Sequence, residues 1–267
     1  MKAVSAIIAI TFITFSAAAH DLWMEPETFF VRPGSKTAIY MYLGEGLSNR
    51  EEKPYLPQKT DSFEVLSRFG VFDLRTLAER DAGPILRFAG DAEGTYLFSM
   101  ARNATLIEID ADKFEAYLRE EGLEEIIAER KRLGESDMPG RERYSRYLKT
   151  ILQVGTELDA SPKKQTNARL EIVPQDNPYA KRVGDRLKFQ VLFAGRPLRN
   201  KAVFVDRRTG GQSDSQKLVT DSDGTVVIKL DAKGTWLIRL VHMQRCERMC
   251  KDADWDSFWA TLTFGVR

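Results

Sequence analysis

The chain has 267 residues, of which 43% are hydrophobic and 30% charged, with 40 basic and 39 acidic side chains. This charge balance excludes the strongly basic surface of a protein that binds nucleic acid or an anionic membrane. The length is sufficient for one large domain or two small ones.

Residues 1–19 have the pattern of an export signal. A positively charged start is followed by an uncharged apolar run from Ala3 to Phe15, and small residues with an A-x-A pattern at Ala17 and Ala19 end the segment. The run is shorter than the ~20 apolar residues that span a bilayer. We therefore expect cleavage after Ala19 and a periplasmic protein that is soluble once the signal is removed. Its first residue would be His20.

Residues 20–110 favour a β domain. Short alternating or β-favouring runs are separated by turns that contain glycine and proline, and residues 49–61 are polar and are expected to form a loop. The expected strands are residues 37–43, 63–66, 71–77, 85–88, 95–100 and 105–109. Their spacing is typical of an antiparallel β-sandwich or barrel.

Residues 111–156 are predicted to form a helical hairpin. Apolar residues recur with helical spacing around Phe114 and again from 123 to 132, and a further helix is expected over 141–155, where Tyr144, Leu148 and Ile151 would share one face. The polar stretch 157–168 contains Ser161-Pro162 and is predicted to be a linker.

Residues 169–267 return to a β pattern. Strands are expected at residues 170–173, 187–193, 202–205, 225–230, 234–243 and 257–266. The predicted fold is therefore mainly β, with two immunoglobulin-like or transthyretin-like β-sandwich domains and an inserted helical segment.

The candidate site follows from the expected amino terminus. A histidine at a free amino terminus offers its α-amine and its ring Nδ1 to one metal ion in a six-membered chelate. His242 is the only other histidine in the sequence and lies at the end of an expected strand. A single histidine there is usually partly buried and hydrogen-bonded, but its pairing with His20 favours a role as a third nitrogen ligand.

Three nitrogen ligands suit Cu(II) or Ni(II), which prefer square-planar nitrogen fields. A carboxylate from Asp21, Glu25 or Asp254 could complete the site, and the sequence does not choose among them. Binding requires a deprotonated amine and neutral imidazole rings, so the affinity should fall below about pH 6.5.

Cys246 and Cys250 are the only cysteines. An exported protein meets an oxidising compartment, which favours a disulfide between them, although thiolates and the neighbouring Met243 and Met249 would also suit a soft ion such as Cu(I). With two histidines in the chain, no Ser/His/Asp triad is expected, and the sequence has no phosphate-binding glycine loop or dinucleotide fingerprint.

Four segments together resemble one bacterial family. They are AHDLW at residues 19–23, ERYSRYLK at 142–149, GTWLIR at 234–239 and DWDSFWATLTF at 254–264. They are similar to the periplasmic domain-of-unknown-function 4198 family, which is associated with nickel or cobalt uptake. The resemblance implies export, β-sandwich domains and handling of a transition metal. The two cysteines are not part of the family pattern.

The residues are interpreted as those of an exported protein that binds a divalent transition metal, copper or nickel/cobalt, and is not an enzyme. Its partners would be the metal ion and a metal transporter component. One alternative is a periplasmic adaptor that binds no metal. A lesser alternative is a copper oxidase, because copper enzymes with a "histidine brace" also use an amino-terminal histidine; that likeness is chemical and does not imply kinship.

Overall fold

The computed structural model describes residues 20–81, 83–247 and 250–267. The predicted signal peptide therefore lies outside the described residues. Most of the described chain is β-structure, as the sequence predicts, and its strands form three sheets. Among the described residues, no helix is long and apolar enough to cross a bilayer.

The largest sheet is the central layer of the molecule. Its strands follow the order β14-β13-β16-β17-β9-β8-β5-β6, and the short β2 also pairs with β9. These strands are β2 (Phe30–Val31), β5 (Thr60–Ser67), β6 (Gly70–Asp73), β8 (Gly94–Ile109), β9 (Gly140–Val154), β13 (Ala202–Thr209), β14 (Gln212–Val219), β16 (Gly234–Arg245) and β17 (Trp255–Val266).

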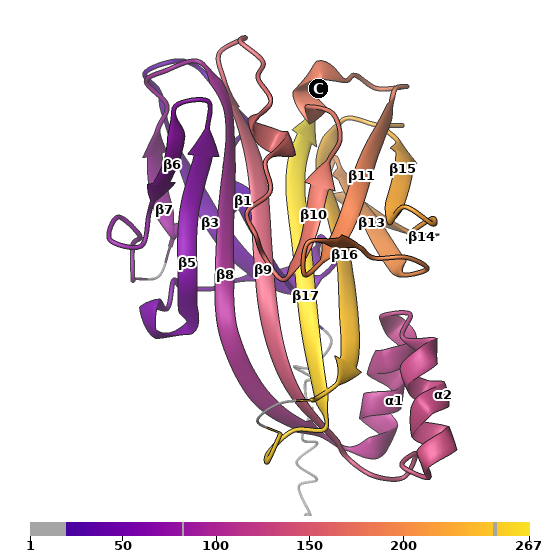
Figure 1. Cartoon of the computed structure of the whole chain (residues 1–267). Helices are drawn as coiled ribbons and strands as arrows, with labels where there is room; N and C mark the ends of the chain where they lie inside the picture. Colours follow the sequence, from indigo (N-terminus) through magenta and orange to yellow (C-terminus); the bar gives the residue numbers. More distant parts are fainter. Residues whose placement is uncertain (1–19, 82, 248–249) are drawn as a thin grey trace, which may run out of the picture.

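Two smaller sheets cover opposite faces of the central sheet, and Figure 1 shows β10 and β11 in front of it and β3 behind it. We call them the N-terminal sheet and the C-terminal sheet. The N-terminal sheet contains β1 (Asp21–Pro26), β3 (Lys36–Glu45), β4 (Ser48–Glu52) and β7 (Leu86–Ala89). The C-terminal sheet contains β10 (Leu170–Pro174), β11 (Arg186–Phe193), β12 (Arg196–Pro197) and β15 (Thr225–Lys229).

Side chains alternate between the two faces of each central strand, and both faces are buried. On β9, Ile151 packs in the cluster beneath the C-terminal sheet, whereas Leu152 packs in the cluster beneath the N-terminal sheet. Strands that are buried on both faces carry apolar residues at consecutive positions instead of a simple alternation.

This double burial explains one error of the sequence prediction. Residues 140–154 form β9 and not a helix, because apolar residues on both faces of a strand can imitate a helical stripe. The helical segment is shorter than the predicted 111–156 and consists of α1 (Ala111–Glu120) and α2 (Glu124–Leu133). The two helices lie beside the ends of β16 and β17 (Figure 1).

The two predicted β domains share the central sheet. β9 pairs in antiparallel register with β8 and in parallel register with β17, from Trp255 opposite Glu142 to Thr263 opposite Thr150. The predicted linker is also packed: Ser161 and Pro162 are buried, and the backbone N–H of Thr95 donates to the carboxylate of Asp159 at 2.8 Å. No uncovered boundary therefore separates the first half of the chain from the second.

We expect Ile151→Ala and Leu152→Ala each to lower the free energy of unfolding by about 2–5 kcal/mol, because each leaves a cavity on a different buried face. Urea unfolding measures both. Val227→Ala on the exposed face of β15 is the matched control and should cost less than about 1 kcal/mol. A tolerated substitution at either β9 position would contradict burial of that face.

Candidate functional site

Hydrogen bonds fix the backbone from His20 onward. The guanidinium of Arg146 donates to the carbonyl oxygen of His20 at 2.8 Å. The hydroxyl of Thr261 on β17 donates to the carbonyl of Leu22 at 3.0 Å, and β1 pairs along its whole length with β3. The residue predicted to become the amino terminus therefore enters a strand anchored to the central sheet.

The imidazole of His20 lies at the edge of the N-terminal sheet with one ring nitrogen unpaired. Its side chain is 20% exposed, and Nε2 lies 3.9 Å from Oε1 of Glu45 on β3. Nδ1 is buried and has no hydrogen-bond partner among the described residues. A buried polar atom without a partner is costly, and such an atom indicates a position where a ligand can bind.

Unlike Nδ1 of His20, the carboxylate of Asp21 has partners within the fold. Its carboxylate accepts a hydrogen bond from the backbone N–H of Gly46 at 3.0 Å and lies 3.2 Å from Nε of Arg239. Gly46 has φ +57°, and a Cβ there would lie 2.7 Å from the carboxylate of Asp206, so glycine is required at this approach. Asp21 therefore serves the packing of β1 and is not a free metal ligand.

Arg239 is the centre of a buried charge cluster. Its Nε lies 2.8 Å from Asp206 on β13, and its Nη1 lies 3.4 Å from Glu121 at the end of α1. Asp21, Asp206 and Glu121 have side chains only 4% exposed. Three carboxylates thus surround one guanidinium, and the fully ionised cluster would carry excess negative charge.

A carboxyl of this cluster relieves the excess by holding a proton. Burial, and after it the charge of Asp21, raises the pKa of Glu121 to about 8. Burial also raises the pKa of Asp21. The folded protein consequently binds more protons than the unfolded chain above the ordinary Glu pKa of 4.5, and stability falls as pH rises toward 8.

We expect Glu121→Gln to remove part of this pH dependence. The neutral amide needs no proton, so the variant should gain about 1–3 kcal/mol relative to wild type between pH 5 and pH 8. Urea unfolding at the two pH values measures the difference. Glu27→Gln, at an exposed position outside the cluster, is the control and should follow the wild type. An equal pH dependence in Glu121→Gln and wild type would contradict the assignment.

His242 lies on the other face of the central sheet. Its ring packs edge-on against Phe193 of the C-terminal sheet, with centroids 4.3 Å apart, and also contacts Phe258. The adjacent residue Val241 packs in the cluster with the helices, on the face toward which β1 lies. The structure therefore does not bring His20 and His242 together, and the predicted pair of histidine ligands is wrong.

Burial determines the protonation state of the His242 ring. Its Nδ1 is buried without a hydrogen-bond partner among the described residues. Burial, followed by the positive charge of Lys201, lowers the pKa of His242 to about 4. The ring is therefore neutral at physiological pH and packs as an aromatic side chain.

We expect His242→Leu to stabilise the protein against acid. Between pH 6.5 and pH 4 the unfolded chain binds a proton at His242 that the folded protein does not, so wild-type stability falls as pH falls through this window. The variant should lack this loss, worth about 1–3 kcal/mol. Thermal unfolding at pH 7 and pH 4.5 measures it. A variant as acid-sensitive as wild type would mean that the His242 ring is accessible to protons.

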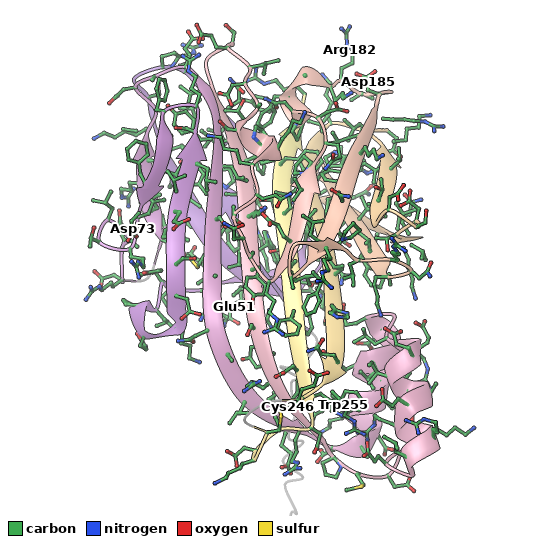
Figure 2. All side chains as sticks on the ribbon, in the orientation of Figure 1. Glu51, Asp73, Arg182, Asp185, Cys246 and Trp255 are labelled. Atoms are coloured by element: carbon green, nitrogen blue, oxygen red, sulfur yellow. A yellow bond between two sulfur atoms is a disulfide. The ribbon has the colours of Figure 1, made fainter. Side chains whose placement is uncertain are left out.

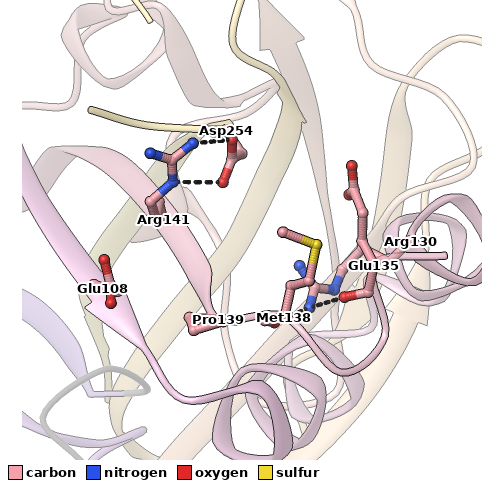
Figure 3. Close-up of a pocket in the computed structure, with 7 residues that line it drawn as sticks. All are labelled: Glu108, Arg130, Glu135, Met138, Pro139, Arg141 and Asp254. Carbon is pink, nitrogen blue, oxygen red and sulfur yellow. Dashed lines mark hydrogen bonds and ion pairs between the residues drawn. The ribbon is translucent and has the colours of Figure 1, made fainter. Parts of the chain in front are cut away.

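The other predicted carboxylate ligands are paired. Arg141 donates to both oxygens of Asp254, at 2.9 and 2.7 Å, beside a pocket of about 280 Å³ (Figure 3). The hydrogen bonds from Arg141 lower the pKa of Asp254. Glu25 accepts from Trp23 Nε1 at 3.1 Å and pairs with Arg50 at 3.2 Å and with Arg208. Both carboxylates are therefore already paired with arginine side chains.

Cys246 and Cys250 form the expected disulfide. It lies just after β16, and Figure 2 shows Cys246 beside Trp255 at the end of the sheet near the helices. Within the described residues, no three His, Cys, Asp or Glu side chains are arranged to hold a metal ion.

The residues that sequence reasoning missed are basic. Arg146 and Arg239 lie on buried strand faces and contact His20 and Asp21, respectively. The sequence predicted a helix around Arg146 and a strand around Arg239, in both cases from the apolar positions alone. An arginine among apolar residues of a strand is rarely buried without a partner, and that was the available signal.

The comparisons with known proteins identify a family and little more. No curated protein matches the chain. A solved structure of dimeric latent PorU from Porphyromonas gingivalis is similar over 90% of this chain, at 11% identity and a TM-score of 0.17, and the chain spans 20% of that protein's length. The domain of unknown function DUF4198 matches residues 17–244, in agreement with the resemblance seen in the sequence. The chain belongs to the DUF4198 family.

Proposed function

We propose that the protein is an exported, periplasmic carrier of a divalent transition metal, copper or nickel/cobalt, and that its ligand residue is His20. The observation that supports the proposal is the buried, unpartnered Nδ1 of a residue whose backbone is fixed by Arg146 and β1. Cleavage after Ala19 would add a free α-amine to the same residue. The two nitrogens then form a chelate of the kind that Cu(II) and Ni(II) accept.

The surroundings of His20 offer few protein ligands, which suits an exchangeable metal ion better than a permanently bound one. Glu45 is the nearest carboxylate, 3.9 Å from Nε2. Arg146 brings a positive charge to the His20 carbonyl, whereas the carboxylates around Arg239 begin one residue later and supply negative charge. With few protein ligands, the ion would keep exchangeable positions and could pass to a transporter component.

The position of His242 weighs against the oxidase alternative. A histidine brace uses two histidines, and this sequence has only His20 and His242. The central sheet separates them, because His242 packs against Phe193 on the opposite face. We therefore propose that the protein carries a metal ion and does not activate oxygen.

The finer classification of the fold belongs to the same proposal. We propose that the C-terminal sheet and strands β13, β14, β16 and β17 correspond to the immunoglobulin-like or transthyretin-like sandwich expected from the sequence. Their facing side chains form one apolar cluster, which includes Phe189, Ile238 and Phe264 and supports this assignment.

Isothermal titration of the protein that begins at His20 with Cu(II) and Ni(II) tests the function. His20→Ala should weaken binding by about tenfold or more, because both the ring nitrogen and its chelate are lost. Acetylation of the α-amine should have a comparable effect, because an acetylated nitrogen no longer donates its lone pair to the metal. Lower pH should also weaken binding, since protons compete for both nitrogens.

His242→Ala is the matched control and should leave the metal affinity unchanged. An unchanged affinity in His20→Ala would reject the metal proposal and favour the adaptor alternative. Mass spectrometry of the secreted protein checks its first residue independently, and a start at any residue other than His20 would remove the amine from the argument.

A further inference from the structure

A pocket of about 260 Å³ lies between the N-terminal sheet and the middle of β8 and β9. Its lining includes four basic side chains and no acidic one. The basic residues are Lys53, Lys59, Arg102 and Arg146. Apolar groups of Leu22, Leu43, Leu56 and Tyr144 complete one side of it.

Two of the arginines face each other across a strand pair. Arg102 on β8 is directly opposite Arg146 on β9, in a sheet where like charges at facing positions are destabilising. The register of β8 shifts between Arg102 and Thr105, which lies opposite Tyr144, and this bulge opens the strand pair beside the pocket. Bulges of this kind often redirect side chains at binding sites.

The positive charges are incompletely neutralised within the described residues. Arg146 is 8% exposed, donates to the carbonyl of His20 and lies over the ring of Trp259. Burial lowers the pKa of Arg146, and the charges of Asp21 and Glu142 oppose this only in part. Arg102 donates only a long hydrogen bond, 3.6 Å, to the sulfur of Met41. Burial, and next the charge of Arg146, lowers the pKa of Arg102.

The lysines extend this positive charge along the pocket. Lys59 forms no ion pair with a described carboxylate, whereas Lys53 pairs with the exposed Glu51 at 2.5 Å. An anion that entered would therefore meet Arg102 and Lys59 without displacing an existing partner. A partly enclosed group of cations of this kind is more favourable with a bound anion than without one.

We propose that this pocket binds a small organic acid, through contact of its carboxylate with Arg102, Arg146 and Lys59 and of its short apolar part with Leu22, Leu43 and Tyr144. The amide of Asn103 and the hydroxyl of Thr105 also line the pocket and can hydrogen-bond the carboxylate. The volume is below the usual ~300–1,000 Å³ of drug-sized sites, so it selects a metabolite-sized ligand. This site is distinct from the proposed metal site and does not depend on it.

Calorimetric titration of metal-free protein, in the presence of a chelator, with benzoate, succinate and inorganic phosphate tests the proposal. Benzoate or succinate should bind saturably at millimolar or lower concentration. Benzamide, the uncharged counterpart of benzoate, should not bind, and phosphate should bind more weakly because it lacks an apolar part. High salt should weaken binding, since the contact is electrostatic.

Arg102→Gln and Lys59→Gln should each weaken binding of the carboxylate by about tenfold or more. Arg102→Gln should also raise the unfolding temperature of the ligand-free protein, because it removes a like-charge contact. Arg186→Gln removes an equal charge from an exposed position on the C-terminal sheet and should change neither property. His20→Ala should retain the carboxylate affinity, which separates this site from the metal site.

Three outcomes would overturn the proposal. They are the absence of saturable carboxylate binding, carboxylate affinities in Arg102→Gln and Lys59→Gln equal to wild type, and phosphate affinity equal to that of the carboxylates. A lower unfolding temperature in ligand-free Arg102→Gln would also contradict it, because Arg102 would then already have its counter-charge within the fold.

Discussion

The parallel pairing of β9 with β17 is the contact on which the architecture depends. It joins a strand from the middle of the chain to the last strand, with nine facing residue pairs in register. Through it, strands from both halves of the sequence become one central sheet, and each half then covers one face with its own smaller sheet. The alternation of side chains along these strands decides on which side of the molecule every residue lies. It is this alternation that places His242 among aromatic side chains and β1 on the opposite face.

Much of the β-structure could be predicted from the sequence, because half-exposed strands and their turns leave a clear pattern. The strands around Phe189 and Val226 are examples. Residues 140–154 could not be assigned correctly, since a strand buried on both faces has apolar residues at spacings that a helix also allows. The strand β14 was missed because its outer positions are polar and exposed, as expected of an edge strand.

The sequence could predict only those parts of the candidate site that belong to one residue or to neighbouring residues. The orphaned nitrogen of His20 belongs to one residue, so the sequence could point to it. The carboxylate of Asp21 contacts Gly46 and Arg239, and Arg239 in turn pairs with Asp206 and Glu121. No spacing along the chain reveals such a convergence. The pairing of His20 with His242 failed for the same reason: two rare residues are not neighbours unless the topology brings them to one face.

The β9–β17 contact also governs how this protein can fold. β9 ends at Val154, and its parallel partner does not begin until Trp255, so about a hundred residues must be made before the central layer can close. Native contacts between distant parts of a chain form slowly because the loop between them must first be closed at an entropic cost. A polypeptide emerging from a ribosome would therefore stay open until its final strand is available. Such a delay would suit the export proposed above, in which the chain is threaded through a translocation channel before it becomes compact.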